Sequence, residues 1–73
     1  MEIINITSEY IKLDQLLKFA NITENGADAK YLVQEGFVFV NGEVEKRRGK
    51  KLYGGEQVEV RYEGQIIKVK VSR

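Results

Sequence analysis

Residues 36–42 read Gly-Phe-Val-Phe-Val-Asn-Gly, and this stretch decides the fold. Its centre, residues 37–40, alternates aromatic and β-branched side chains, which favours a strand. Asn41-Gly42 follows at once and is the strongest short signal for a β-hairpin, because that turn needs a positive φ at both positions. Residues 43–45 therefore return as the partner strand. Gly36 is placed to end a preceding helix in the left-handed backbone conformation.

A strand and two helices are expected before this stretch. Residues 2–7 are predicted to form a short strand, with Thr7 or Ser8 capping the first helix. That helix runs from about Lys12, residues 21–26 form a loop, and a second helix covers about residues 27–35. Each helix has one apolar stripe, and the two stripes can face each other as a helical hairpin. The stripes are Leu13, Leu16, Leu17 and Ala20 in the first helix and Ala29, Leu32 and Val33 in the second.

Short strands are expected after the hairpin. Residues 57–61 and 65–71 alternate with period two, and Lys51-Leu52-Tyr53 is a candidate for a further short strand. Ile67, Val69 and Val71 are expected on the same side of the last strand. The order of elements predicts an α+β domain, with a two-helix hairpin packed on a small, mainly antiparallel sheet of about four to five strands. We expect residues 1–73 to form a single domain.

Positive charge is concentrated in one part of the chain, although the net charge is only +1. Residues 1–36 carry three lysines against six acids, whereas residues 37–55 carry five lysines and arginines against two acids. All five of these cations lie in the stretch Lys46-Arg47-Arg48-Gly49-Lys50-Lys51, here called the basic segment. Five adjacent cations repel one another, and a bound polyanion would relieve that repulsion and release counterions. The alternative is a solvated loop that protects a sheet edge from aggregation.

A longer pattern joins these features. It consists of Lys12-Leu13-Asp14-x-x-Leu17, then Ala29-Lys30-x-Leu32-Val33-x-x-Gly36-x-Val38-x-Val40-Asn41-Gly42, then Gly55-Glu56-x-Val58-x-Val60. In order and spacing, the pattern resembles the S-four RNA-binding domain, or αL motif, over roughly residues 11–61. Residues 36–42 together with the basic segment further resemble the stand-alone bacterial YaaA-like group. The resemblance implies the αL-motif RNA-binding fold, and RNA binding as the whole activity.

The resemblance also implies which side chains contact RNA. By position these are Lys12, Lys30, Arg47, Arg48, Lys50 and Lys51. Lys12 lies in the first helical turn, where a cation is unfavourable beside the positive end of the helix dipole, so a functional reason for it is favoured. Lys30 could equally pair with Asp28, Gln34 or Glu35. We expect contact to centre on the basic segment, and about five phosphate contacts would give a log K against log salt slope of about −3.5 to −4.5.

The rings of Phe37 and Phe39 can be interpreted in two ways, as exposed or as covered. If Val38 and Val40 face the helices, then Phe37 and Phe39 lie on the other face of the sheet. Exposed rings there could stack on unpaired bases. The alternative is that other segments of the chain cover them, as is usual for aromatic side chains in sheets.

Catalysis and metal binding find little support. The chain has no Cys and no His, which excludes disulfides and the usual thiolate or imidazole metal ligands. Its few Ser and Thr hydroxyls have no adjacent base. We therefore expect a non-enzyme without cofactor or metal. The N-terminus lacks a basic region followed by an apolar run, and no stretch approaches the about 20 apolar residues of a membrane span, so a cytoplasmic location without a membrane partner is expected.

The expected partner is structured RNA, either ribosomal or transfer RNA, with a ribosomal particle as a further candidate, and the chain is expected to be a monomer. The competing hypothesis is a protein-interaction adaptor that uses the acidic helical face or the aromatic sheet face. A ubiquitin-like sulfur carrier is disfavoured, because such a carrier needs a free C-terminal Gly-Gly and residues 71–73 read Val-Ser-Arg.

Overall fold

The computed structural model describes residues 1–73, which form two helices and seven strands. In chain order the elements are β1 (Glu2–Asn5), β2 (Ile11–Lys12), α1 (Leu13–Phe19), α2 (Gly26–Gln34), β3 (Val38–Val40), β4 (Glu43–Val44), β5 (Lys51–Leu52), β6 (Gln57–Tyr62) and β7 (Gln65–Ser72). Neither helix is long and apolar enough to cross a membrane.

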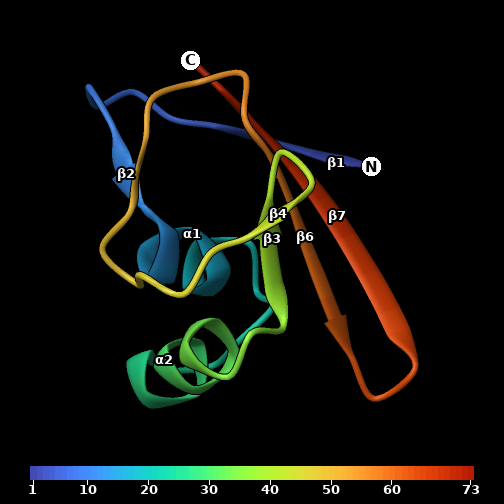
Figure 1. Cartoon of the computed structure of the whole chain (residues 1–73). Helices are drawn as coiled ribbons and strands as arrows, with labels where there is room; N and C mark the ends of the chain where they lie inside the picture. The colour runs from blue at the N-terminus through green and yellow to red at the C-terminus, as the bar shows by residue number, and fades with distance from the viewer.

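Five strands make one sheet in the order β1-β7-β6-β3-β4, and both helices lie on the same side of it (Figure 1). All neighbouring strands in this sheet are antiparallel except β1, which runs parallel to β7. β2 and β5 pair separately as a second, two-stranded antiparallel sheet. The predicted α+β class, with a helical hairpin on a mainly antiparallel sheet, is confirmed.

One apolar core lies between the helices and the sheet. Val38 and Val40 of β3 are buried, as are Val58 and Val60 of β6, because alternate side chains of these strands point toward the helices. Both predicted helical stripes are also buried, apart from Ala20 at the end of α1, which is only partly covered. The core members are Ile4, Ile6, Leu13, Leu16, Leu17, Ala29, Leu32, Val33, Val38, Val40, Leu52, Val58, Val60, Val69 and Val71.

The turn between β3 and β4 has the backbone that its sequence predicts. Asn41 and Gly42 adopt φ values of 51° and 85°, so both positions are left-handed. The Asn41 side-chain carbonyl also accepts a hydrogen bond from the backbone N–H of Gln57 at 2.9 Å. This contact ties the hairpin turn to the beginning of β6.

The prediction that Thr7 or Ser8 caps the first helix is wrong. The N-cap is Lys12, whose backbone N–H donates to Oε1 of Gln15 at 3.3 Å. The Ser8 hydroxyl instead donates to the carbonyl of Tyr10 at 2.8 Å. The helix starts late because Ile11 and Lys12 are already paired with β5. In α2, Asn25 is the N-cap, and its side chain accepts from the N–H of Asp28 at 2.9 Å.

The end of the β6–β7 hairpin is less covered than the rest of the core. Ile67 lies on the same side of β7 as Val69 and Val71, as predicted, because it pairs with the buried Val60, but its side chain is 37 % exposed. Its neighbour Ile66 is also exposed. Ile67 and Leu32 of α2 line the same small cavity, so the helix does not pack tightly on this part of β7, and Figure 1 shows the end of the hairpin diverging from α2.

Candidate functional site

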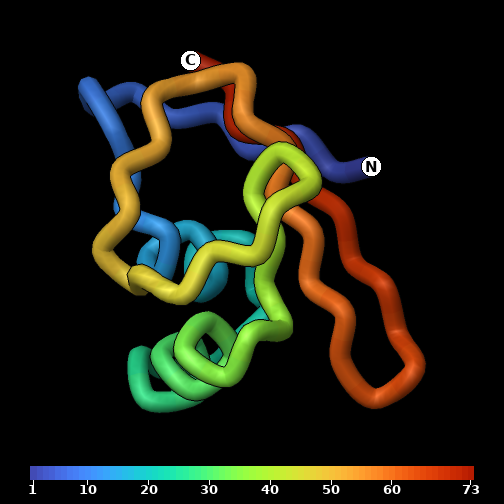
Figure 2. Tube along the Cα trace, in the orientation of Figure 1, coloured from blue at the N-terminus to red at the C-terminus, as the bar shows by residue number.

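The basic segment is fixed against the start of α1. Beyond β4 the chain leaves the main sheet, passes across α1, runs along β2 and then enters β6 (Figure 2). The backbone N–H of Leu13 donates to the carbonyl of Lys50 at 2.8 Å, and that of Asp14 donates to the carbonyl of Arg48 at 3.0 Å. N–H groups in the first turn of a helix have no partner within the helix, so these bonds satisfy donors that would otherwise be unpaired.

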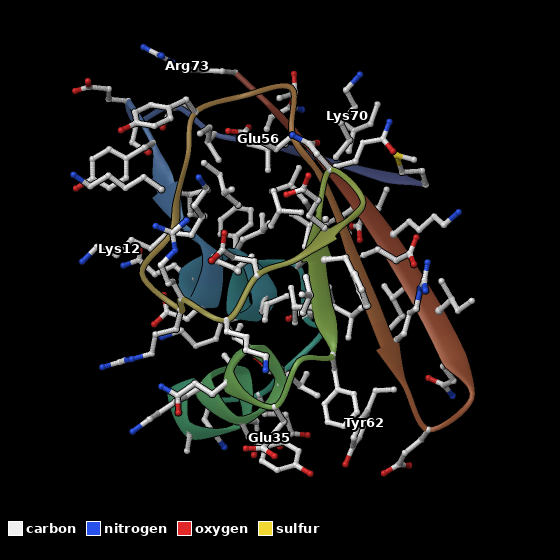
Figure 3. The ribbon with its side chains drawn as sticks, in the orientation of Figure 1. Lys12, Glu35, Glu56, Tyr62, Lys70 and Arg73 are labelled. Atoms are coloured by element: carbon white, nitrogen blue, oxygen red, sulfur yellow. The ribbon has the colours of Figure 1, made fainter.

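Lys12 and Lys51 are direct partners in the β2–β5 ladder. Both side chains are exposed, and neither has a carboxylate within ion-pair distance. Like charges directly opposite each other destabilise a sheet, and Lys12 also lies at the positive end of α1. Figure 3 shows the Lys12 side chain pointing outward, away from the core. The like-charge pairing and the helix end both disfavour a cation at Lys12, which indicates a role other than stability for this side chain.

An aromatic pair adjoins these lysines. The Nζ atom of Lys51 lies 4.7 Å from the centroid of the Tyr10 ring, a cation–π contact. The Tyr10 and Tyr53 rings are 6.0 Å apart and tilted by 56°. The sequence could not predict that Tyr10 lies beside Lys51, because this contact depends on the pairing of two strands of only two residues each.

The two arginines of the basic segment are paired with acids of this chain. Arg47 Nε lies 2.9 Å from Oε2 of Glu45, and a second hydrogen bond joins Nη2 to Oε1 at 3.2 Å. These hydrogen bonds from Arg47 hold the pKa of the Glu45 carboxyl below its usual value. Arg48 Nη1 lies 3.6 Å from Oδ2 of Asp14. The repulsion among the five cations is therefore smaller than the sequence suggested.

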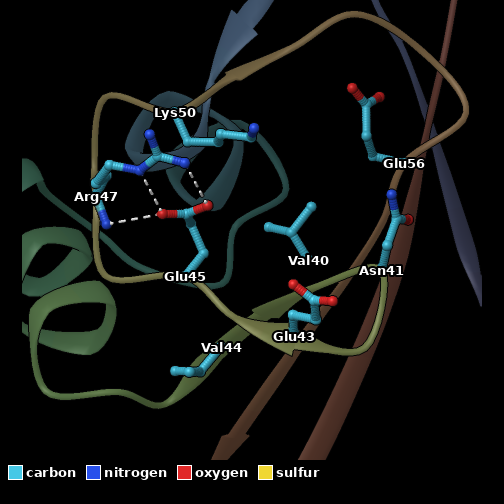
Figure 4. Close-up of a pocket in the computed structure, with 8 residues that line it drawn as sticks. All are labelled: Val40, Asn41, Glu43, Val44, Glu45, Arg47, Lys50 and Glu56. Carbon is cyan, nitrogen blue, oxygen red and sulfur yellow. Dashed lines mark hydrogen bonds and ion pairs between the residues drawn. The ribbon is translucent and has the colours of Figure 1, made fainter.

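A polar cavity of about 440 Å³ lies between the β3–β4 hairpin and the basic segment (Figure 4). Glu45, Arg47, Lys50 and Glu56 are among its lining residues. Glu56 accepts hydrogen bonds from the backbone N–H groups of Tyr53 at 2.8 Å and Gly54 at 2.7 Å. Burial alone would raise the pKa of Glu56, but these two donors lower it below the usual value.

The structure brings most of the predicted RNA-contacting residues together. The backbones of Lys12, Arg48, Lys50 and Lys51 lie side by side where the β2–β5 ladder joins α1, and we call this set the cationic face. Arg47 flanks it through the polar cavity that it shares with Lys50. Lys30 stands on a different element, exposed on α2, and forms no ion pair with Asp28 or Glu35.

The two phenylalanines of the hairpin stretch are covered by this chain's own residues. Phe39 lies on the sheet face away from the core, half-buried, with the Arg61 guanidinium 4.6 Å from its ring centroid. Phe37 is half-buried at the edge of the core, with its ring centroid 4.9 Å from that of Tyr62. Both positions fit the covered alternative rather than free stacking platforms.

Comparison with known sequences gives a consistent result. The S4 domain family model matches residues 4–70. A protein of Bacillus subtilis (strain 168) named "Probable ribosome maturation protein RlbA" is 46 % identical over 57 residues, which is 78 % of this chain and 80 % of that protein. The "Putative RNA-binding protein YbcJ" of Escherichia coli (strain K12) is 41 % identical over 49 residues, 67 % of this chain and 70 % of that one.

Solved structures agree with the fold. The solution structure of YbcJ from E. coli, described as an αL motif involved in RNA binding, superposes with a TM-score of 0.63 at 32 % identity. That match covers 96 % of this chain and 87 % of YbcJ. Heat Shock Protein 15 of Vibrio cholerae superposes with a TM-score of 0.76 at 25 % identity, over 89 % of this chain and 65 % of the Vibrio chain. The predicted αL-motif fold is confirmed.

Proposed function

Because this chain belongs to the S4 domain family, we propose that it binds structured RNA through the cationic face, without catalysis. Residues 1–73 act as one module in this proposal. Lys12, Arg48, Lys50 and Lys51 meet the phosphates, and Arg47 and Lys30 are flanking contacts. The observation that carries the proposal is the pair Lys12 and Lys51, opposed in a ladder with no acid beside them.

The geometry suits recognition of a backbone more than of bases. The major groove of A-form RNA is too deep and narrow for side chains to read, so proteins recognise helical RNA largely through its shape and its phosphate and 2′-hydroxyl groups. The cationic face is held by two backbone hydrogen bonds and a ladder, which fix the backbone from which its side chains project before RNA arrives. A preorganised surface loses less conformational entropy on binding.

The names of the relatives indicate which RNA to test first. One is called a probable ribosome maturation protein and another a putative RNA-binding protein. Ribosomal RNA, within a maturing ribosomal particle, is therefore the first candidate ligand, and transfer RNA is the second. A role in ribosome maturation would place the protein in the cytoplasm, the location expected from the sequence, where it would act as a monomer.

The salt dependence of binding follows from the number of available cations. Arg47 already shares the Glu45 carboxylate at 2.9 Å, which leaves the four cations of the cationic face, Lys12, Arg48, Lys50 and Lys51, as the main contacts. Four phosphate contacts predict a log K against log salt slope of about −2.8 to −3.6, or a loss of about 50- to 150-fold between 50 and 200 mM salt. This is shallower than the slope expected from the sequence. Filter binding with bulk ribosomal RNA and bulk transfer RNA at several salt concentrations measures this slope. A slope near zero for both RNAs would contradict the proposal.

A charge-matched pair of variants locates the surface. The triple variant K12Q/K50Q/K51Q removes three cations from the cationic face, and K18Q/K68Q/K70Q removes three from elsewhere on α1 and β7. Three lost phosphate contacts at 0.1 M salt predict that the first variant binds about 100- to 500-fold more weakly. The second should bind within about threefold of the parent, as expected for charges outside the contact surface. Equal losses in the two variants would mean that binding follows overall charge.

A further inference from the structure

A second surface, with the opposite charge, lies where α2 approaches the end of β6. A cavity of about 400 Å³ opens there, and a smaller one of about 110 Å³ adjoins it. Ile22, Leu32 and Tyr62 line both, so the two cavities form one groove with an apolar floor. The loop after α1 forms one wall, and it is held in place because the N–H of Ile22 donates to the carbonyl of Leu17 at 2.9 Å.

The groove carries only negative charge. Glu24 and Asp28 line it, no lysine or arginine does, and neither acid is in an ion pair. On α2, Asp28, Tyr31 and Glu35 follow at i, i+3 and i+7, so they share one side of the helix. Lys30 projects from another side. Such a groove repels phosphate and attracts a cation.

Aromatic rings stand beside these acids. The Tyr31 and Tyr62 ring centroids are 6.3 Å apart with the rings nearly perpendicular, at 81°. Tyr31 is 51 % exposed, so part of its side chain is accessible to a ligand. Figure 3 shows Tyr62 at the same end of the molecule as Glu35, away from Lys12. An arginine or lysine held over a tyrosine face within about 6 Å gains a cation–π attraction.

One polar group at the groove has no partner in this chain. Thr23 lines the larger cavity, is only 8 % exposed, and its Oγ1 atom makes no hydrogen bond. A buried hydroxyl without a partner is unfavourable, by roughly 1–3 kcal/mol. A ligand donor would satisfy it once a small local shift uncovers the Oγ1 atom, which is almost fully covered in the free protein. This is an observation independent of the acids, and it points to the same groove.

We propose that this acidic–aromatic groove, formed by Thr23, Glu24, Asp28, Tyr31 and Tyr62, binds arginine or lysine side chains of a basic protein segment. The cation lies over the Tyr31 ring between the two carboxylates, and one of its N–H groups donates to the Thr23 hydroxyl. RNA on the cationic face and a basic polypeptide in the groove can then be held at the same time, because the two surfaces lie on different sides of the molecule.

The test uses a heptapeptide of alternating glycine and arginine with blocked ends, titrated into the ¹⁵N-labelled chain and followed by amide chemical shifts. Shifts are expected at residues 22–24, Asp28, Tyr31 and Tyr62. Removing both carboxylates in E24Q/D28N should weaken peptide binding about fivefold, the effect of two exposed ion pairs. The charge-matched control E2Q/E9Q, with both acids exposed elsewhere, should bind the peptide as the parent does.

Three results would overturn the proposal. One is that E24Q/D28N and E2Q/E9Q weaken peptide binding equally, which would mean that peptide binding depends only on net charge. Another is a set of shifts scattered over the acidic surface. The third is a hexa-adenylate RNA that shifts the same groove amides, which would make the groove a base-stacking site. E24Q/D28N should bind ribosomal RNA as well as the parent does. If the groove proposal fails, the proposal that the cationic face binds RNA is therefore unaffected.

Discussion

Replacing Lys12 by Glu should make the protein more stable and a poorer RNA binder at once. Lys12 opposes Lys51 in the β2–β5 ladder and is also the N-cap of α1. The change turns a like-charge pair into an opposite-charge pair, worth about 0.2–1 kcal/mol. It also places a negative charge at the positive end of a helix, worth about 0.3–1 kcal/mol. Because both sites are exposed, we expect a total near 1 kcal/mol.

Thermal unfolding followed by circular dichroism measures the first effect. For a domain of this size, about 1 kcal/mol raises Tm by roughly 4–8 °C. Filter binding at 0.1 M salt measures the second effect. Loss of one phosphate contact weakens binding about five- to eightfold at that salt concentration. K12Q removes only the phosphate contact and should show this five- to eightfold weakening. K12E should bind RNA more weakly still, because its carboxylate repels phosphate.

The opposite signs of the two effects make this a sharp test. If Lys12 were a structural residue, K12E would lower Tm, and the reasoning about the ladder and the helix end would be refuted. If K12E and K12Q bound ribosomal RNA as well as the parent, then Lys12 would lie outside the contact surface.

The remaining predictions concern the core and the buried polar groups. L52A should lower the free energy of unfolding by about 2–5 kcal/mol in urea titrations, since Leu52 is fully buried and anchors the basic segment, whereas the exposed I66A should cost less than about 1 kcal/mol. The folded-state pKa of Glu56 is depressed, so the Glu56 carboxylate stabilises the fold above about pH 4.5, and this stabilisation is lost as the pH falls. The difference in free energy of unfolding between E56Q and the parent should therefore shrink between pH 7 and pH 3. T23V removes an unpaired buried hydroxyl and should raise stability by about 1 kcal/mol, and a loss of that size would mean that the hydroxyl already has a partner.

Local sequence signals predicted the elements well. The Asn41-Gly42 turn needs a left-handed backbone, which few other dipeptides adopt easily, and the structure has it there. The helical stripes around Leu16 and Leu32 repeat at helical spacing and are buried. Period two in residues 57–61 likewise predicted a strand, and its alternate residues Val58 and Val60 are buried. Each of these signals comes from residues close together in the chain, so no knowledge of the tertiary fold was needed.

Contacts between distant segments could not be predicted in the same way. β2 and β5 are two residues long, too short for any periodicity, and their pairing decides where α1 begins and why Lys12 meets Lys51. The ion pair between Asp14 and Arg48 depends on the same pairing. Ile67 follows the strand pattern but borders a cavity beside Leu32, so it stays partly exposed. Residue type and family resemblance were enough to predict which cations contact RNA. That Lys30 lies apart from the other predicted residues, on α2, could be learned only from the fold.

Lysine footprinting can locate the RNA on the protein, because the eight lysines lie on different parts of the molecule. The free protein and its complex with bulk ribosomal RNA are briefly acetylated, and modification at each lysine is read by mass spectrometry. RNA on the cationic face should protect Lys12, Lys50 and Lys51 and leave Lys18, Lys68 and Lys70 reactive. Protection of Lys68 and Lys70, with Lys12 and Lys51 still reactive, would place the RNA on the open face of the sheet and contradict the account.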